Sequence, residues 1–188
     1  MPPDHNRISS DYRRALRGFA ATVSIVSVRT AKGNAGITVT AVSSVSMEPP
    51  SLLVVVNAAS SMHSSLVEAS RFCINILGAE HVEHSRTFGT PMPMDERFEA
   101  GDWRLSADDV PYLCEAQANI FCEKAEAFTY GTHTVFVGRV YQLAIGDAIC
   151  PLIYLNGRYL RLADEAPDAV RSGASRGVAA PAVVPVRA

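Results

Sequence analysis

The clearest pattern along the chain is an alternation of apolar and polar residues at 36–40, followed by a serine-rich stretch and a second apolar run. Ile37 and Val39 alternate with threonines, so a strand here buries one row of side chains and presents a row of hydroxyls on its other face. A double proline at 49–50 ends the serine-rich stretch. Residues 51–57 are almost continuously apolar, which predicts a strand buried on both faces.

Similar patterns divide the rest of the chain into strands and short helices. Beta-branched residues at 22–30 and a turn at 31–34 predict a hairpin with the alternating strand. Residues 90–109 are rich in Pro, Asp, Glu and Gly, which indicates an irregular excursion with a helical turn at 94–98. Further strands are predicted at 72–77, 114–128, 134–144 and 150–160. Helices are predicted from a cap at Ser9 or Ser10 to Phe19, at 60–69 and at 79–88.

This order of elements predicts a mainly β protein with peripheral helices. Six or more β segments separated by turns are typical of a closed antiparallel barrel. Side chains fill a barrel of this size, so a cofactor has to bind on its outside or at a seam between subunits. We expect one domain at 9–163, a disordered N-terminus at 1–8, and a disordered Ala/Pro/Val-rich tail at 164–188.

Composition and charge narrow the possible partners. The net charge of −2 over 188 residues, without a basic stripe, argues against a nucleic-acid partner. No apolar run is long enough for a membrane helix, and residues 1–5 do not resemble a secretory signal, so we expect a cytoplasmic protein that does not bind membranes. The four cysteines form no C-x-x-C pair and are predicted to be buried free thiols.

Hydroxyls and free backbone N–H groups at the mouth of a β-structure suit a phosphate or the polar edge of a heterocycle. The serine-rich start of the predicted helix at 60–69 offers a second phosphate site. The alternative is an edge strand followed by a serine-rich loop without a ligand. His81 and His84 lie beside Glu80 and Glu83, but no third-ligand motif accompanies them. We therefore expect a solvated helix surface and no metal.

The sequence contains no recognisable nucleophile motif and no G-x-G-x-x-G fingerprint. Any nicotinamide cofactor must therefore bind without a Rossmann unit. From the residues alone, no reaction can be named.

Three stretches resemble the short-chain flavin reductase family: 36–50, G-I-T-V-T-A-V-S-S-V-S-M-E-P-P; 131–140, G-T-H-T-V-F-V-G-R-V; and 151–159, P-L-I-Y-L-N-G-R-Y. The resemblance covers about residues 10–162. It implies an FMN-binding split β-barrel, a Greek-key antiparallel barrel that forms a homodimer with the flavin near the interface. It also implies hydride transfer from NADH or NADPH to FMN or FAD, and delivery of reduced flavin to a partner flavin-dependent monooxygenase.

The resemblance also implies the residues of the site. His133 is the implied catalytic residue and belongs to the nucleotide-binding set with Tyr154, Arg158 and Tyr159. The flavin-binding residues that it implies are Thr38, Val39, Thr40, Ser44, Val45, Ser46, Asn57, Ser60, Ser61, His63, Ser64, Phe88 and Gly89.

The chain departs from the family pattern at two positions. Thr132 stands where the family usually has Asp, and the Gly of the family's first-strand pattern F-A-T-G-V is absent from this chain, which has Thr22 at that position of F-A-A-T-V. Arg139 either pairs with a carboxylate across the barrel or has a role at the site. Two other functions stay open: an oxidase of the pyridoxamine-phosphate-oxidase type, and a flavin-binding redox module without turnover.

Overall fold

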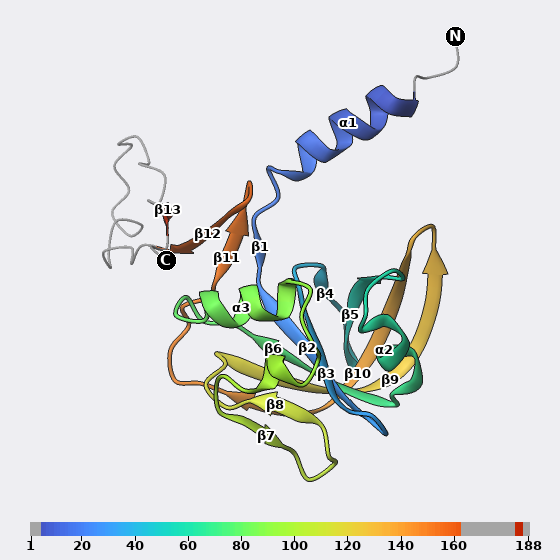
Figure 1. Ribbon diagram of the computed structural model, residues 1–188, viewed down its shortest axis with the longest axis vertical. Helices are drawn as coiled ribbons and strands as arrows, with labels where there is room; N and C mark the ends of the chain where they lie inside the picture. Colours follow the sequence, from blue (N-terminus) through green and yellow to red (C-terminus); the bar gives the residue numbers. More distant parts are fainter. Residues whose placement is uncertain (1–4, 163–182, 186–188) are drawn as a thin grey trace.

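The computed structural model describes residues 5–162 and 183–185, and most of them belong to antiparallel β-structure (Figure 1). A seven-stranded sheet has the order β3-β2-β6-β9-β10-β5-β4. Its strands are β2 (Ser24–Thr30), β3 (Gly33–Val39), β4 (Val42–Met47), β5 (Pro50–Asn57), β6 (Arg71–Ile76), β9 (Ala118–Tyr130) and β10 (His133–Ile145). The predicted mainly β fold with few helices is confirmed.

Two smaller sheets flank the large one. A four-stranded sheet has the order β1-β11-β12-β13, and β7 pairs with β8. Their bounds are β1 (Ala21–Thr22), β11 (Ile153–Leu155), β12 (Arg158–Leu162), β13 (Val183–Pro185), β7 (Trp103–Leu105) and β8 (Pro111–Leu113). The helices are α1 (His5–Leu16), α2 (His63–Glu68) and α3 (Val82–Gly89), with a 3-10 turn at Glu96–Phe98.

The large sheet curls until β3 approaches β5, and the main hydrophobic core lies inside the curl. Val26, Val54, Phe72 and Phe136 are fully buried there, and α2 adds Leu66 to the same cluster. A second cluster lies between the two larger sheets and α3; its buried members include Val23, Leu77, Phe88, Leu113 and Leu152. Burial of these apolar side chains is the main force holding the sheets together.

The ends of the chain differ from the prediction. Helix α1 begins at His5 rather than at Ser9 or Ser10, and it ends at Leu16 rather than at Phe19. Residues 5–8 are therefore helical, whereas 1–4 lie outside the described residues. In the predicted tail, Val183–Pro185 pair with β12, and the remaining residues after 162 also lie outside the described part.

Several internal predictions are also corrected. The long strand predicted from Cys114 begins only at Ala118, and the excursion at 90–109 contains β7, which pairs with β8. The predicted strand at 150–160 is the hairpin of β11 and β12, and the turn residue Asn156 has a φ of 50°. All four cysteines are free, but only Cys73 and Cys122 are buried, and Cys150 is exposed. No helix in the described part of the chain is long and apolar enough to cross a membrane.

Candidate functional site

Strand β3 is an edge strand of the large sheet, so it has backbone groups that face no neighbouring strand. At Gly36 the backbone N–H and C=O both form hydrogen bonds with side chains. The N–H donates to Met94 Sδ at 3.3 Å, and the carbonyl accepts from Arg97 Nη1 at 2.9 Å. Outward-facing groups recur every second residue in an antiparallel pair. The N–H and C=O of Thr38 are therefore directed away from β2 in the same way.

A cavity of about 200 Å³ adjoins Thr38 and Thr40. The Thr38 hydroxyl donates to the carbonyl of Ser85 at 2.8 Å, and Ser85 Oγ shares a hydrogen bond of 2.9 Å with the Tyr159 hydroxyl. The Tyr154 and Tyr159 rings pack edge to face with centroids 5.4 Å apart. All these residues line the cavity, together with Val23 and Val39. The structure thus brings predicted flavin residues and predicted nucleotide residues together at one place.

Sequence reasoning missed two members of this cavity, Val23 and Ser85. Val23 lies in the short gap between β1 and β2, where the chain passes from one sheet to the other. Ser85 is buried on the face of α3 that packs against β3. Nothing in the local sequence marks either residue, because each reaches the cavity through contacts between elements that are distant along the chain.

Ser61 and Ser64 line a second cavity, of about 690 Å³, near the β2–β3 turn. The neighbouring predicted residues form local hydrogen bonds instead. Asn57 Oδ1 accepts from the Ala59 N–H at 2.9 Å, and Ser60 Oγ accepts from the Met62 N–H at 3.2 Å. His63 Nε2 is 2.8 Å from Thr134 Oγ1, a buried hydroxyl on β10. These three side chains therefore shape the start of α2.

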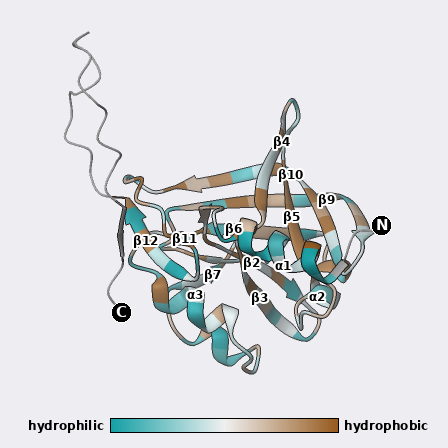
Figure 2. Cartoon of the chain, turned by 90° about the horizontal axis from the view of Figure 1, so that it is seen from above, coloured by the Kyte–Doolittle hydropathy of each residue, from teal (hydrophilic) through white to brown (hydrophobic). Residues whose placement is uncertain are grey.

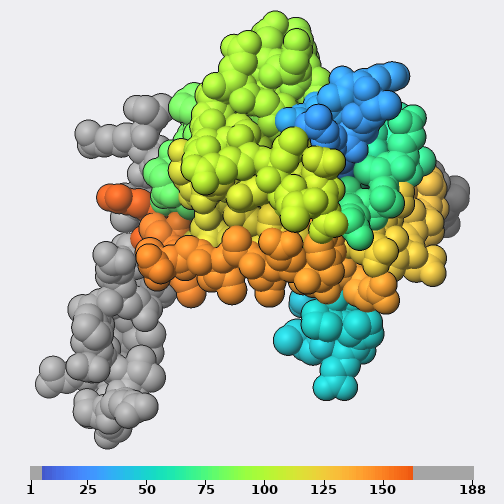
Figure 3. All heavy atoms as spheres, turned by 90° about the horizontal axis from the view of Figure 1, so that it is seen from below, coloured from blue at the N-terminus to red at the C-terminus, as the bar shows by residue number. Residues whose placement is uncertain are grey.

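Ser44, Val45 and Ser46 lie on β4, which projects from the barrel (Figures 2 and 3). The pairing of β4 with β5 shifts register between Ser44 and Ser46, and the Val45 side chain is exposed. Ser46 Oγ accepts from the Glu48 N–H at 3.0 Å. None of the three lines either of the two cavities described above. The structure thus places this part of the predicted flavin set apart from Thr38.

His133 is exposed at the start of β10, where it pairs with Asn57 of β5. Thr132 Oγ1 lies 2.9 Å from His133 Nδ1, so this hydroxyl contacts the ring from the position where the family usually has Asp. Arg158 is exposed on β12. The structure therefore divides the predicted nucleotide set. Tyr154 and Tyr159 line the smaller cavity, and His133 lies with the Asn57 end of β5.

The prediction that Phe88 closes over a flavin is wrong. Phe88 is fully buried, and its ring centroid lies 5.0 Å from those of Phe98 and Trp103. A Cβ at Gly36 would come within 2.7 Å of the Phe88 ring, so the ring packs directly against the β3 backbone. Phe88 therefore supports β3 from the side. Gly89 is exposed, and a Cβ there would lie 3.8 Å from Thr38 Cβ.

Arg97 is a buried cation that sequence reasoning also missed. Its side chain is 4% exposed and donates to the carbonyls of Gly36 at 2.9 Å, Phe88 at 3.2 Å and Thr90 at 3.0 Å. Burial lowers the pKa of the guanidinium. No carboxylate pairs with it among the described residues, and its Nε has no partner there. Arg97 thus joins the end of α3 and the following loop to the edge of β3.

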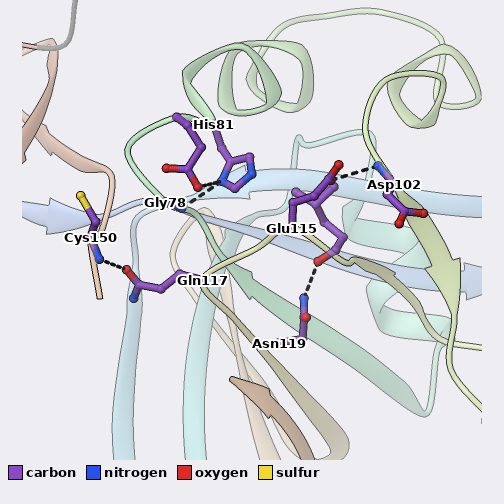
Figure 4. Close-up of polar contacts among 9 residues, drawn as sticks. Gly78, His81, Asp102, Glu115, Gln117, Asn119 and Cys150 are labelled. Carbon is purple, nitrogen blue, oxygen red and sulfur yellow. Dashed lines mark hydrogen bonds and ion pairs between the residues drawn. The ribbon is translucent and has the colours of Figure 1, made fainter. Parts of the chain in front are cut away.

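His81 and His84 do not form the solvated helix surface that was predicted. His81 is 4% exposed, and its Nδ1 accepts a hydrogen bond from the Gly78 N–H at 3.1 Å (Figure 4). Burial lowers the pKa of His81, although Glu80 opposes this shift. The described part of the chain holds no cluster of three residues that could bind a metal. His81 is the N-cap residue of α3, and its ring bonds back to the loop before the helix.

Arg139 pairs with a carboxylate, but with one on the neighbouring strand rather than across the barrel. Its Nη2 lies 2.7 Å from Glu123 Oε2 on the neighbouring strand β9. The guanidinium lowers the pKa of Glu123 by hydrogen bonding and by charge. Both side chains are about half exposed, so the pair adds little to stability.

Known proteins resemble this chain over most of its length. The flavin reductase like domain model matches residues 16–163. The reductase component of the FADH(2)-dependent resorcinol hydroxylase of Rhizobium sp. (strain MTP-10005) is 39% identical over 155 residues, covering 81% of this chain and 86% of that protein. FMN reductase (NADH) RutF of Variovorax paradoxus (strain S110) is 40% identical over 154 residues, covering 82% and 86%.

A solved structure gives the same result for the fold. The NADH:FAD oxidoreductase SgcE6 of Streptomyces globisporus C-1027, in complex with NAD and FAD fragments, superposes with a TM-score of 0.77 at 26% identity. The match covers 90% of this chain and 99% of that one.

Removing Arg97 should strongly destabilise the protein. We expect Arg97→Met to lower the free energy of unfolding in urea by about 3 kcal/mol or more, because each buried carbonyl left without a donor costs about 1–3 kcal/mol. Arg97→Lys should recover part of the loss. The control is Arg71→Met, which breaks the partly exposed pair with Asp108 and should cost about 0–1 kcal/mol. Equal losses of unfolding free energy for Arg97→Met and Arg71→Met would contradict the conclusion that Arg97 joins α3 and the following loop to β3.

The buried His81 should make stability depend on pH. Its pKa is lowered in the folded state, so the unfolded chain binds the proton more readily. The stability that the neutral His81 ring contributes is complete above about 6.5, the pKa of histidine in the unfolded chain. It is lost as the pH falls below that value. We expect the urea midpoint of the natural chain to drop between pH 7.5 and 5.5. His81→Asn, which keeps an acceptor but does not titrate, should show a smaller drop. Identical pH slopes would rule out this role.

Proposed function

The chain belongs to the flavin reductase like domain family, and on this basis we propose that it is an NADH-dependent flavin reductase supplying reduced FMN or FAD to a partner monooxygenase. The observation that carries the proposal is the cavity at Thr38. There the free edge of β3 faces Tyr154 and Tyr159, two residues that the resemblance assigns to the nicotinamide nucleotide. A flavin reductase must hold the nicotinamide ring and the flavin ring at one place, because hydride transfer requires these two rings to be in contact.

The residues at this cavity suit the polar edge of a flavin ring. The backbone N–H and C=O of Thr38 are directed away from β2, and Thr40 carries an exposed hydroxyl next to them. Val23 and Val39 supply apolar surface beside these polar groups. A planar heterocycle with donors and acceptors along one edge needs this combination. When bound, the flavin supplies the chemistry by accepting a hydride from NADH.

The protein's own contribution is orientation. The chain of hydrogen bonds from Thr38 through Ser85 to the Tyr159 hydroxyl fixes the position of the Tyr159 ring. Arg86 lies 5.8 Å from the centre of that ring and adds a cation–π contact. Ser61 and Ser64, which line the larger cavity, are proposed to supply hydroxyls for the flavin phosphate. His133 and Arg158 are proposed to contact the nucleotide, and His133 is the proposed catalytic residue.

We also propose that the working unit is a homodimer. Large apolar side chains are exposed on the parts that project from the barrel. Among them, Val45 is 52% exposed, Met47 81% and Tyr130 84%. Helix α1 stands clear of the barrel in Figure 1 and exposes Tyr12 and Leu16. A second copy covering these surfaces would bring β4, with Ser44 and Ser46, toward a flavin. Sedimentation should give twice the chain mass; a monomer that binds flavin tightly would contradict the dimer.

The reaction is tested by anaerobic reduction. NADH added to the flavin-loaded protein without oxygen should abolish the visible absorbance of the oxidised flavin within seconds. A module without turnover would keep the absorbance, which would overturn the proposal. A parallel assay with pyridoxamine phosphate and oxygen should give no product; turnover there would favour an oxidase instead.

Removing His133 should impair the nucleotide step more than flavin binding. We expect His133→Ala to lower kcat/KM for NADH by about 10- to 1000-fold, equivalent to about 1.4–4 kcal/mol of transition-state stabilisation. Flavin affinity is the internal control. It should stay within a few-fold of the natural chain, because the proposed flavin contacts are made at Thr38, Ser61 and Ser64 and not at His133. A variant that loses flavin but keeps its NADH kinetics at saturating flavin would show that His133 belongs to the flavin site.

A further inference from the structure

Gly131 and Thr132 are the two residues of the turn between β9 and β10, and His133 is the first residue of β10. Gly131 has a φ of 58°, a value that two-residue hairpin turns require and that glycine adopts without strain. The Thr132 carbonyl accepts a hydrogen bond of 2.9 Å from the N–H of Ala58, which lies in the loop between β5 and α2. The backbone of Thr132 is therefore held in place by a contact outside its own hairpin.

The exposed ring of His133 has one hydrogen-bond partner in the part of the chain that the structure describes. This partner is Thr132 Oγ1, which lies 2.9 Å from Nδ1 of the ring. Tyr130 of β9 and Asn57 of β5 are directly opposite His133, so their side chains share its face of the sheet. The Asn57 side-chain oxygen bonds to the N–H of Ala59 instead. Nε2 is therefore the ring nitrogen left for a ligand.

The residues that face the His133 ring from the neighbouring strands carry no charge. Tyr130 is the titratable residue opposite it on β9, and Asn57 on β5 does not titrate. None of the ion pairs among the described residues includes His133. His63 of α2 lies 2.8 Å from Thr134 Oγ1, but Thr134 follows His133 along β10, so its side chain is on the opposite face. The Thr132 hydroxyl is therefore the group that acts on Nδ1.

The chemistry of the two groups decides which atom donates. An unprotonated imidazole nitrogen is a stronger acceptor than an alcohol oxygen, so the Thr132 hydroxyl donates to Nδ1 of His133, and the ring carries its own proton on Nε2. When the ring takes up a second proton, this proton binds Nδ1, and the hydroxyl rotates to accept a hydrogen bond from it. Nε2 thus keeps its N–H in both forms. A carboxylate in place of the hydroxyl would accept from Nδ1–H, so the neutral ring would have no proton on Nε2.

We propose that Thr132 is a positioning residue that keeps the Nε2–H of His133 available as a hydrogen-bond donor to the nicotinamide nucleotide throughout the neutral pH range. This inference rests on the proposed function, in which His133 contacts the nucleotide. The oxygen atoms of the carboxamide and of the phosphates of NADH accept such a bond. Because the donor is present whether the ring is neutral or charged, the nucleotide step does not depend on the titration of His133.

The pH dependence of kcat/KM for NADH, measured at saturating flavin, tests this role. In the natural chain it should change less than about twofold between about pH 6.5 and about pH 8.5. In Thr132→Asp it should fall about tenfold over that range, because the ring then loses its Nε2 proton as the pH rises. Thr132→Val should lose about two- to tenfold at each pH, the effect of one neutral hydrogen bond, and Thr132→Ser should restore the loss.

The control is Thr129→Val, which makes the same change on the same hairpin without touching the His133 ring, and it should match the natural chain. Equal pH profiles for Thr132→Asp and the natural chain would overturn the proposal. So would a natural chain whose kcat/KM falls about tenfold as the pH rises.

The position of the ring proton can be measured without flavin or NADH. In NMR spectra of the nitrogen-labelled full-length protein, the side-chain resonances of His133 are identified by their loss in His133→Ala. Above neutral pH they should show the proton on Nε2 in the natural chain and on Nδ1 in Thr132→Asp. A proton on Nδ1 in the natural chain would overturn the proposal. The expected positions would support the role of Thr132 even if NADH reduced no flavin, in which case only the proposed reaction would fail.

Discussion

The unpaired edge of β3 is the constraint on which the rest of the site depends. A strand at the edge of a sheet leaves every second residue with an N–H and a C=O that need partners. In this chain the side chains of Met94 and Arg97 form hydrogen bonds with the N–H and the C=O of Gly36. The groups of Thr38 stay available beside a cavity. The division between an internally bonded stretch and an available stretch determines where a polar heterocycle can bind.

Arg97 holds the edge of β3 in place with a buried charge. A buried cation without a carboxylate partner is costly, and only hydrogen bonds to several carbonyls make the position tolerable. Here the carbonyls belong to β3, to the end of α3 and to the loop that follows. A neutral side chain could not join three segments in this way. The close approach of Gly89 to Thr38 is therefore maintained by a residue that lines neither cavity.

The sequence predicted what depends on local pattern. The alternation at 36–40 and the apolar run at 51–57 correspond to β3 and β5, because strand periodicity is visible over a few residues. The burial of β5 differs from the prediction, since its residues alternate between buried and half-buried instead of being buried on both faces. The resemblance to flavin reductases added Tyr154 and Tyr159, which the structure brings to Thr38. Contacts between distant residues could not be predicted. Arg97 is 61 residues from Gly36, and Ser85 is 74 residues from Tyr159. For the same reason, the sequence does not show that the Phe88 ring is buried against the backbone of β3 at Gly36.

The cavity at Thr38 is lined by residues of two different sheets, so its width depends on how the sheets pack. Its threonines belong to β3 and the residue after it, whereas its tyrosines belong to β11 and β12. The backbone of Val23 bonds to Leu152 and Leu77 and is a link between the sheets. The second hydrophobic cluster, with Leu77 and Leu152, is packed between the same two sheets. The separation of the threonines from the tyrosines is therefore fixed by buried apolar contacts, and a cavity made in that cluster would alter the site without touching any residue that lines it.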